Sequence, residues 1–396
     1  MARRDPWLDN AKMALVTLVV VGHAWTLAPP GPLRDHLYDF LYAWHVPAFV
    51  LVTGFLSKSF AYTRARWWML VRTVVVPYLV FEAGIAVFRI YVGGEQLEDL
   101  FADPHWPMWY LAALFFWRVM TPPFKAMPTP VALTVAVAAS LVAGLYFSDL
   151  LDLARVFGLL PFFVLGLKAT PERLELLRAR GVAWVAVGVF AVIAVLTRFT
   201  DAIAETEWLY YRARYDELVA SDTEAFAIRA GVLAVGLCGA LAFLALVPRV
   251  EGWFTRMGVY TLVVYLFHGF AVKGASYAGF DEWAVDHAGL SLVITTVGGV
   301  GLALLLAWRP LASVLTELVD PFGYAERHTT QAVTLAEVVE VVQETPVQLM
   351  DNDLADAAVV PEIPTPGEVA RAEAALEPEP ATPAGGVPPA QPDRDG

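Results

Sequence analysis

The sequence predicts an all-α integral membrane protein, in which about ten transmembrane helices enclose a central cavity and a disordered C-terminal tail follows them. Three observations predict this fold class. Of the 396 residues, 58% are hydrophobic and only 17% are charged, whereas a typical globular chain is about 45–50% apolar and about 25% charged. The apolar residues form runs of the length that crosses a bilayer, about 17–25 residues. The acidic residues, in contrast, gather near the C-terminus.

The body divides into ten predicted spans almost without remainder. The third contains Arg72, Pro77, Glu82 and Arg89, and the sixth is short, so eight to eleven spans also fit the pattern. The predicted spans are residues 11–28, 38–58, 67–92, 107–124, 131–148, 154–169, 182–199, 226–248, 257–275 and 289–309.

The distribution of basic residues predicts the orientation of the spans, because short cytoplasmic loops retain Lys and Arg. With the N-terminus inside, the inner segments hold most of the basic residues, among them Lys58, Lys125 and Lys168. We therefore expect a multi-pass protein of the cell membrane with both termini in the cytoplasm. The N-terminal run also resembles a signal peptide, but it contains His23 and no convincing cleavage site.

The net charge of −13 comes mostly from the C-terminal end. Residues 326–396 hold 14 acidic and 3 basic side chains and are rich in Pro, Ala and Glu, a composition that cannot bury enough apolar area to fold. We predict two parts: a polytopic transmembrane domain over 1–320 and a disordered acidic cytoplasmic tail over 321–396. The tail is a candidate binding segment for a cytoplasmic partner.

Composition also excludes several classes of function. An excess of acid argues against a nucleic-acid binder, because phosphate neutralisation needs clustered Lys and Arg. Cys238 is the single cysteine, which excludes an internal disulfide framework and a cysteine-based zinc or iron–sulfur site. No metal is expected.

Ionisable side chains inside a span are costly, so each is a candidate functional residue. Lys12 and His23 on the first span are eleven residues apart. At about 100° and about 1.5 Å per residue, they lie on one helix face about 16 Å apart. Lys12 could also be a snorkelling anchor at the interface. We predict His23 and Lys12 as the catalytic residues.

The remaining candidates predict a cavity with two chemically different ends. The predicted substrate-binding residues lie in the outer half of the bilayer: His45, Glu82, Trp109, Tyr110 and His268. The predicted cofactor-binding residues lie at the inner side: Arg64, Arg66 and Arg72. Helix packing, an interfacial aromatic belt and the positive-inside rule are the structural alternatives for these residues. The outer segment 208–215 is expected to be an interfacial helix, with acceptor contact as the alternative.

This polarity fits a particular chemistry. An anionic cytoplasmic donor would dock at the inner basic groups, and a neutral imidazole near the far end would act as general base on an incoming hydroxyl. Acetyl-CoA, or another acyl-CoA, is such a donor. Its phosphates need cations, and its pantetheine arm can carry the thioester inward.

The same residues carry a family resemblance. The first span, LDNAKMALVTLVVVGHAW, resembles the opening of the membrane-bound acyltransferase 3 family and its fucose 4-O-acetylase-like branch, in which Arg or Lys precedes His by eleven positions. The segment YAWHVPAFVLVTGFLSKSF resembles the second block of that family and contains His45 and Gly54. Four further blocks follow in order: VRTVVVPYLVFE, MWYLAALFFW, LLPFFVLGL and YTLVVYLFHGF.

The resemblance implies transfer of an acyl group, usually acetyl, from a cytoplasmic CoA thioester to a hydroxyl on an envelope glycan, glycolipid or related acceptor. His23 would be the base or a transiently acylated residue, and Lys12 would position the donor or balance charge. The family often has Arg-x-x-Arg before its third span, a spacing that Arg64, Arg66 and Arg72 do not show. A transporter or flippase without covalent chemistry is the main alternative, and a scaffold acting through the tail is another.

Overall fold

The computed structural model describes residues 5–97, 103–146, 150–179, 181–200, 205–218 and 221–323. All regular structure within these residues is helical, as the sequence predicts. The described residues belong to one compact unit that ends at Gln331. The predicted disordered tail lies almost wholly outside the described residues and stays a prediction.

The helices follow one another with short connections. In the first half they are α1 (Pro6–Ala24), α2 (Pro32–Tyr42), α3 (His45–Leu56), α4 (Arg64–Leu70), α5 (Val76–Tyr91), α6 (Trp109–Ala126), α7 (Thr129–Tyr146), α8 (Leu153–Gly158) and α9 (Leu160–Lys168). In the second half they are α10 (Pro171–Glu175), α11 (Val182–Leu196), α13 (Glu207–Tyr210), α14 (Asp222–Leu246), α15 (Trp253–Met257), α16 (Thr261–Tyr277), α17 (Phe280–Val285), α18 (Ala288–Leu306) and α19 (Arg309–Val319).

Each of the ten predicted spans contains a helix, but ten membrane crossings are not confirmed. In the described part of the chain, seven helices are long and apolar enough to cross a membrane, or eight if the pair α8 and α9, bent by 55°, is one span. The helices outside this set are α6, which contains Pro122, Pro123 and two basic residues, and α16, which has 17 residues.

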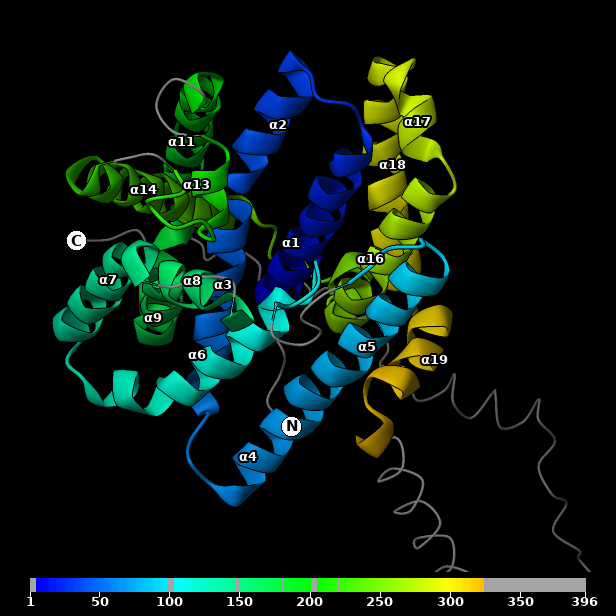
Figure 1. The fold of residues 1–396 in the computed structure, drawn as a ribbon. Coiled ribbons are helices and arrows are strands. Elements are labelled where there is room, and N and C mark those ends of the chain that lie inside the picture. The colour runs from blue at the N-terminus through cyan, green and yellow to red at the C-terminus, as the bar shows by residue number, and fades with distance from the viewer. Residues whose placement is uncertain are drawn as a thin grey trace, which may run out of the picture. The chain divides into compact units, whose positions relative to one another are not determined.

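Helix α1 lies inside the bundle, between α3 on one side and α16 and α18 on the other (Figure 1). Asp5 caps its start, accepting a hydrogen bond from the Trp7 amide at 3.0 Å, and Pro6 occupies the first turn, where its missing N–H costs nothing. Apolar residues on several sides of the helix are fully buried: Ala11, Met13, Leu15, Val16 and Val20. A helix that is apolar all round is stable only inside a protein or a membrane.

The peripheral helices expose their apolar side chains instead. On α11, Trp184 is 79% exposed and Val185 is 65% exposed, and on α18 Val297 is 67% exposed. Exposed apolar faces of this extent are costly in water and are favourable against lipid tails, which have no hydrogen-bonding groups to offer. The helical body is therefore that of a membrane protein.

Helices α3 and α9 cross with their backbones in contact, and two glycines permit it. A Cβ atom on Gly54 would lie 2.0 Å from the Phe163 carbonyl oxygen, and one on Gly166 would lie 1.9 Å from the Leu51 carbonyl oxygen. Both glycines occur in the sequence blocks noted above. Small residues at a membrane helix crossing allow this close approach, which brings the His45 helix against the rest of the bundle.

Prolines shape two of the spans. The five residues Val71–Val75 form a π-helical turn between α4 and α5, directly before Pro77. Proline cannot donate the helical hydrogen bond, and a π turn is a frequent local adjustment inside an α-helix. The bend between α8 and α9 lies at Leu159, two residues before Pro161.

Candidate active site

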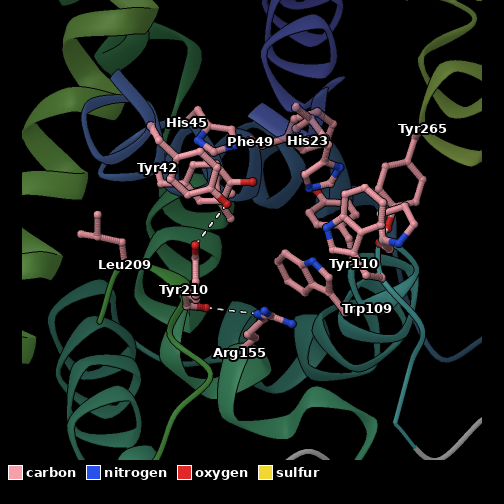
Figure 2. Close-up of a pocket in the computed structure, with 15 residues that line it drawn as sticks. His23, Tyr42, His45, Phe49, Trp109, Tyr110, Arg155, Leu209, Tyr210 and Tyr265 are labelled. Atoms are coloured by element: carbon pink, nitrogen blue, oxygen red, sulfur yellow. Dashed lines mark hydrogen bonds between the residues drawn. The ribbon is translucent and has the colours of Figure 1, made fainter. Parts of the chain in front are cut away.

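A pocket of about 240 Å³ lies among α1, α2, α3, α6, α8, α13 and α16 (Figure 2). Its wall is mainly aromatic, with tyrosine hydroxyls, two histidines and one arginine as the polar groups. The lining includes His23, Tyr38, Tyr42, His45, Phe49, Trp106, Trp109, Tyr110, Arg155, Leu209, Tyr210 and Tyr265. An apolar pocket with a few convergent polar groups is the usual form of a small-molecule site.

His23 is held by a second histidine, and the hydrogen bonds determine its tautomer. His268 Nδ1 lies 3.1 Å from the Val264 carbonyl oxygen, which can only accept, so neutral His268 carries its proton on Nδ1. His268 Nε2 is then an acceptor, and it lies 2.8 Å from His23 Nδ1. His23 Nδ1 therefore donates this hydrogen bond, which leaves His23 Nε2 unprotonated. The His23 ring lines the pocket with a nitrogen that can take up a proton.

His45 is the other histidine of the pocket and is 1% exposed. Its Nδ1 lies 2.7 Å from the Leu41 carbonyl oxygen, one turn earlier in the chain. By the same reasoning Nδ1 donates, and Nε2 is an acceptor for a ligand hydroxyl. The Tyr42 ring packs edge-on against it, with centroids 4.8 Å apart.

The segment 105–107 closes one side of the pocket and is tied to two helices. The Glu82 carboxylate on α5 accepts hydrogen bonds from both the backbone N–H (2.7 Å) and the Nδ1 of His105. On α16, the Tyr265 hydroxyl donates to the carbonyl oxygen of Pro107. Between these two ties the Trp106 ring packs on His23 with centroids 4.3 Å apart. Glu82 and Tyr265 thus hold the indole against the imidazole.

Arg155 contributes a permanent positive charge to the pocket, and three neighbours orient it. Its Nη1 donates to both oxygens of Asp152, at 2.9 and 2.8 Å, and its Nε donates to the Tyr210 carbonyl oxygen at 3.2 Å. The guanidinium lies over the Trp109 ring, 4.9 Å from the centroid. Figure 2 shows it pointing into the space between Tyr210 and Trp109. A guanidinium fixed in this way is preorganised to hydrogen-bond an oxygen of a bound substrate.

A family model described as an acyltransferase domain matches residues 5–309, more than three quarters of the chain. The chain belongs to the acyltransferase 3 family. It is therefore a membrane-bound acyltransferase. The chain matches no curated protein and no solved structure.

The acyltransferase pocket contains four of the seven predicted catalytic and substrate-binding residues: His23, His45, Trp109 and Tyr110. His268 is fully buried behind His23 and reaches the pocket through it. Glu82, predicted as a substrate-binding residue, is 1% exposed and contacts the pocket only through the segment 105–107. The three predicted histidines and Glu82 are thus brought together around one pocket, in different roles.

The structure does not bring Lys12 to the pocket. Lys12 lies on α1, eleven residues before His23, or about 16 Å along the axis. Its ammonium forms an ion pair with Asp9 at 2.7 Å. A direct contact of Lys12 with the chemistry at His23 has no support in this geometry. Its predicted part in positioning a donor or balancing charge stays a prediction.

The three predicted donor-binding arginines lie in different surroundings. Arg64 begins α4 and is exposed. Arg66 lines a small second pocket. Arg72 forms a two-pronged ion pair with Asp320, with Nε and Nη2 to carboxylate oxygen distances of 2.8 and 2.9 Å. They do not form one cluster.

Sequence reasoning missed several residues of the pocket. Arg155 was counted only as an outer charge, and Trp106 precedes the predicted fourth span. Tyr38 and Tyr42, whose rings stack with centroids 4.0 Å apart, were not singled out. The segment 208–215 was expected to be an interfacial helix. Instead Trp208 is 2% exposed, and Leu209 and Tyr210 line the pocket, so the aromatic run was itself the signal.

The acyltransferase has no group of three or more His, Cys, Asp or Glu suited to a metal ion among its described residues. The groups available for catalysis in the pocket are therefore imidazoles, tyrosine hydroxyls and one guanidinium.

Proposed function

We propose that this protein transfers an acyl group, acetyl in the simplest case, from a cytoplasmic acyl-CoA to a hydroxyl of a cell-envelope glycan, glycolipid or related acceptor. The observation that carries the proposal is the His23–His268 hydrogen bond, which leaves His23 Nε2 free of a proton in an aromatic pocket. The chain's membership of the acyltransferase 3 family supports the reaction class.

The proposed step is direct. His23 Nε2 removes the proton of the acceptor hydroxyl while the hydroxyl oxygen attacks the thioester carbonyl carbon. The C–S bond then breaks, and the imidazolium returns the proton to the leaving thiolate, so that the products are an ester and free CoA. His268 keeps His23 in the tautomer that this step requires. Arg155 is available to hydrogen-bond the oxygen on which negative charge develops.

The pocket wall suits a sugar as the acceptor. Aromatic rings provide apolar faces, and the hydroxyls of Tyr38 and Tyr210, 3.1 Å apart, provide a polar edge. His45 Nε2 offers a further acceptor for a sugar hydroxyl. A sugar ring presents the same combination of apolar faces and polar edges.

The inner end of the bundle is the proposed cytoplasmic side. Three lysines predicted to be cytoplasmic meet there and cap helix ends: Lys125 Nζ donates to the Lys58 carbonyl oxygen at 2.7 Å, and Lys168 Nζ donates to that of Met127 at 2.6 Å. Basic side chains at one end of a bundle agree with the positive-inside rule. In this orientation the pocket opens toward the outer half of the membrane.

The test uses the full-length protein in lipid nanodiscs with radiolabelled acetyl-CoA and envelope extracts as acceptor. We expect release of free CoA with label entering one lipid or glycan fraction, and loss of both in His23→Ala. His287→Ala, which alters an exposed histidine outside the pocket, is the matched control and should retain activity.

Mass spectrometry of envelopes from deletion and wild-type cells would identify the acceptor as the species that loses one acyl increment. Absence of CoA release with every envelope fraction, together with an intact cellular phenotype in His23→Ala, would overturn the proposal. A transporter without covalent chemistry would give this second result.

A further inference from the structure

A second, smaller pocket of about 70 Å³ lies between the end of α3 and the adjoining parts of α4 and α6. Two arginines line it, Arg66 on α4 and Arg118 on α6, together with Ser57 and Ser59 from the short 3-10 turn that follows α3. Sequence reasoning placed Arg66 at the inner side and did not consider Arg118. Lys58, between the two serines, belongs to the lysine group at the proposed cytoplasmic end.

The two guanidiniums of this pocket have no acidic partner in the described residues, in which neither Arg66 nor Arg118 forms an ion pair. Other half-buried arginines of the chain are paired: Arg72 with Asp320, Arg89 with Glu95 and Arg155 with Asp152. Two like charges around one small space repel each other unless an anion lies between them. Guanidiniums and hydroxyls together are the groups that bind a phosphate.

Helices α3 and α6 connect this pocket to the catalytic pocket. On α3, Phe49 lines the catalytic pocket, and Ser57, eight residues later, lines the second one. On α6, Tyr110 and Arg118 have the same separation. Eight residues correspond to about 12 Å of helix. An extended amide chain covers about 3.5 Å per residue length, so the pantetheine arm can span this separation.

A single side-chain contact lies between the pockets on these two helices. Thr53, one turn after Phe49, forms a hydrogen bond between its hydroxyl and that of Tyr110. The Ser57 hydroxyl in turn donates to the Thr53 carbonyl oxygen at 2.8 Å. The Thr53–Tyr110 bond joins α3 to α6 across the direct line from one pocket to the other.

We propose that Arg66 and Arg118 bind a phosphate group of the acyl-CoA donor, and that the Thr53–Tyr110 contact closes the passage through which its pantetheine arm reaches His23. This inference rests on the proposed function. It assigns Arg118 as a donor-binding residue and leaves Arg72 to its ion pair with Asp320.

Isothermal titration of CoA into the full-length protein in nanodiscs tests the phosphate site. Loss of a charge-assisted contact predicts a rise in Kd of about 10- to 100-fold in Arg66→Ala and in Arg118→Ala, with partial recovery in Arg118→Lys. Arg309→Ala, at an exposed arginine outside the pocket, is the matched control and should leave Kd unchanged.

A phosphate-free donor separates loss of binding from loss of folding. Transfer from acetyl-pantetheine should be equal in Arg118→Ala and wild-type protein, because this donor has no phosphate for Arg118 to contact. A variant that fails to fold would lose both donors. Equal losses with the two donors in a variant of unchanged thermal stability would overturn the inference.

Thr53→Val tests the passage, since it removes the hydroxyl and keeps the side-chain shape. We expect acetyl-CoA hydrolysis without acceptor, in which water attacks the thioester to give acetate and CoA, to rise several-fold. An unchanged rate would place the passage elsewhere and overturn this part.

The outcomes also separate this inference from the proposed function. CoA binding that ignores both arginines, alongside His23-dependent transfer, would overturn the inference alone. CoA binding that requires both arginines, without transfer to any envelope acceptor, would support the phosphate site and count against the proposed function.

Discussion

The two pockets of this acyltransferase differ in how their polar groups are satisfied. In the catalytic pocket His23, His45 and Arg155 each have a hydrogen-bond partner within the protein. In the second pocket Arg66 and Arg118 have no ion-pair partner among the described residues. Groups that must react in a fixed geometry are preorganised by their neighbours. Groups that only bind can leave the pairing to a ligand.

Removing the base should give the largest effect and should separate the two pockets functionally. His23→Ala is expected to lower kcat by about 10²- to 10⁴-fold, the usual contribution of a general base, and to leave CoA affinity unchanged because the second pocket is intact. Stopped-flow or radiolabel assays measure the first and calorimetry the second. A parallel loss of CoA binding would contradict the division of roles.

The next effect concerns the histidine behind the base, His268. His268→Phe keeps a ring against Tyr265 and Trp106 but removes the acceptor for His23 Nδ1, so we expect kcat to fall about 10- to 100-fold with little change in KM. His268→Gln restores an acceptor oxygen and should recover part of the loss. A purely structural role for His268 would show no difference between Phe and Gln, and the pH dependence of kcat would not change.

A smaller effect is expected at Glu82, which holds the segment that carries Trp106. Glu82→Ala leaves the buried His105 N–H without its acceptor, which costs about 1–3 kcal/mol of stability, and frees the indole that packs on His23. Glu82→Gln keeps an oxygen for that N–H and should cost less. Thermal unfolding and kcat are measured together. Equal behaviour of Ala and Gln would show that the hydrogen bond does not position the segment.

The smallest effect on chemistry is expected at the crossing of α3 and α9, which supports both pockets at once. Gly54→Ala places a Cβ against the Phe163 carbonyl and should lower the free energy of unfolding by about 1–3 kcal/mol. Gly84→Ala is the control, because its Cβ would meet only Phe270 at an ordinary 3.6 Å. If Gly54→Ala is as stable as Gly84→Ala, the close crossing is not required.

Prediction from the sequence succeeded where it depended on local properties. Apolar runs located a helix in each of the ten predicted spans, and the cost of a buried charge singled out His23, His45, Glu82 and His268, all of which surround one pocket. It was weaker where a residue's partner lies far away in the chain. Arg72 was predicted to bind the donor, and nothing near it in sequence indicates Asp320. Trp106 and Tyr210 lie in connections whose path no periodicity describes.

The sequence by itself determined that this is a helical membrane protein of the acyltransferase 3 family, because hydrophobicity and motif order are properties of the chain. Only the tertiary structure decided that His268 orients His23, that Glu82 acts through His105, and that Arg118 rather than Arg72 shares a pocket with Arg66. The physical reason is that hydrogen bonds and ion pairs reach only a few ångströms. The pairing of residues 245 positions apart, such as His23 and His268, depends on helix packing and not on their spacing in the chain.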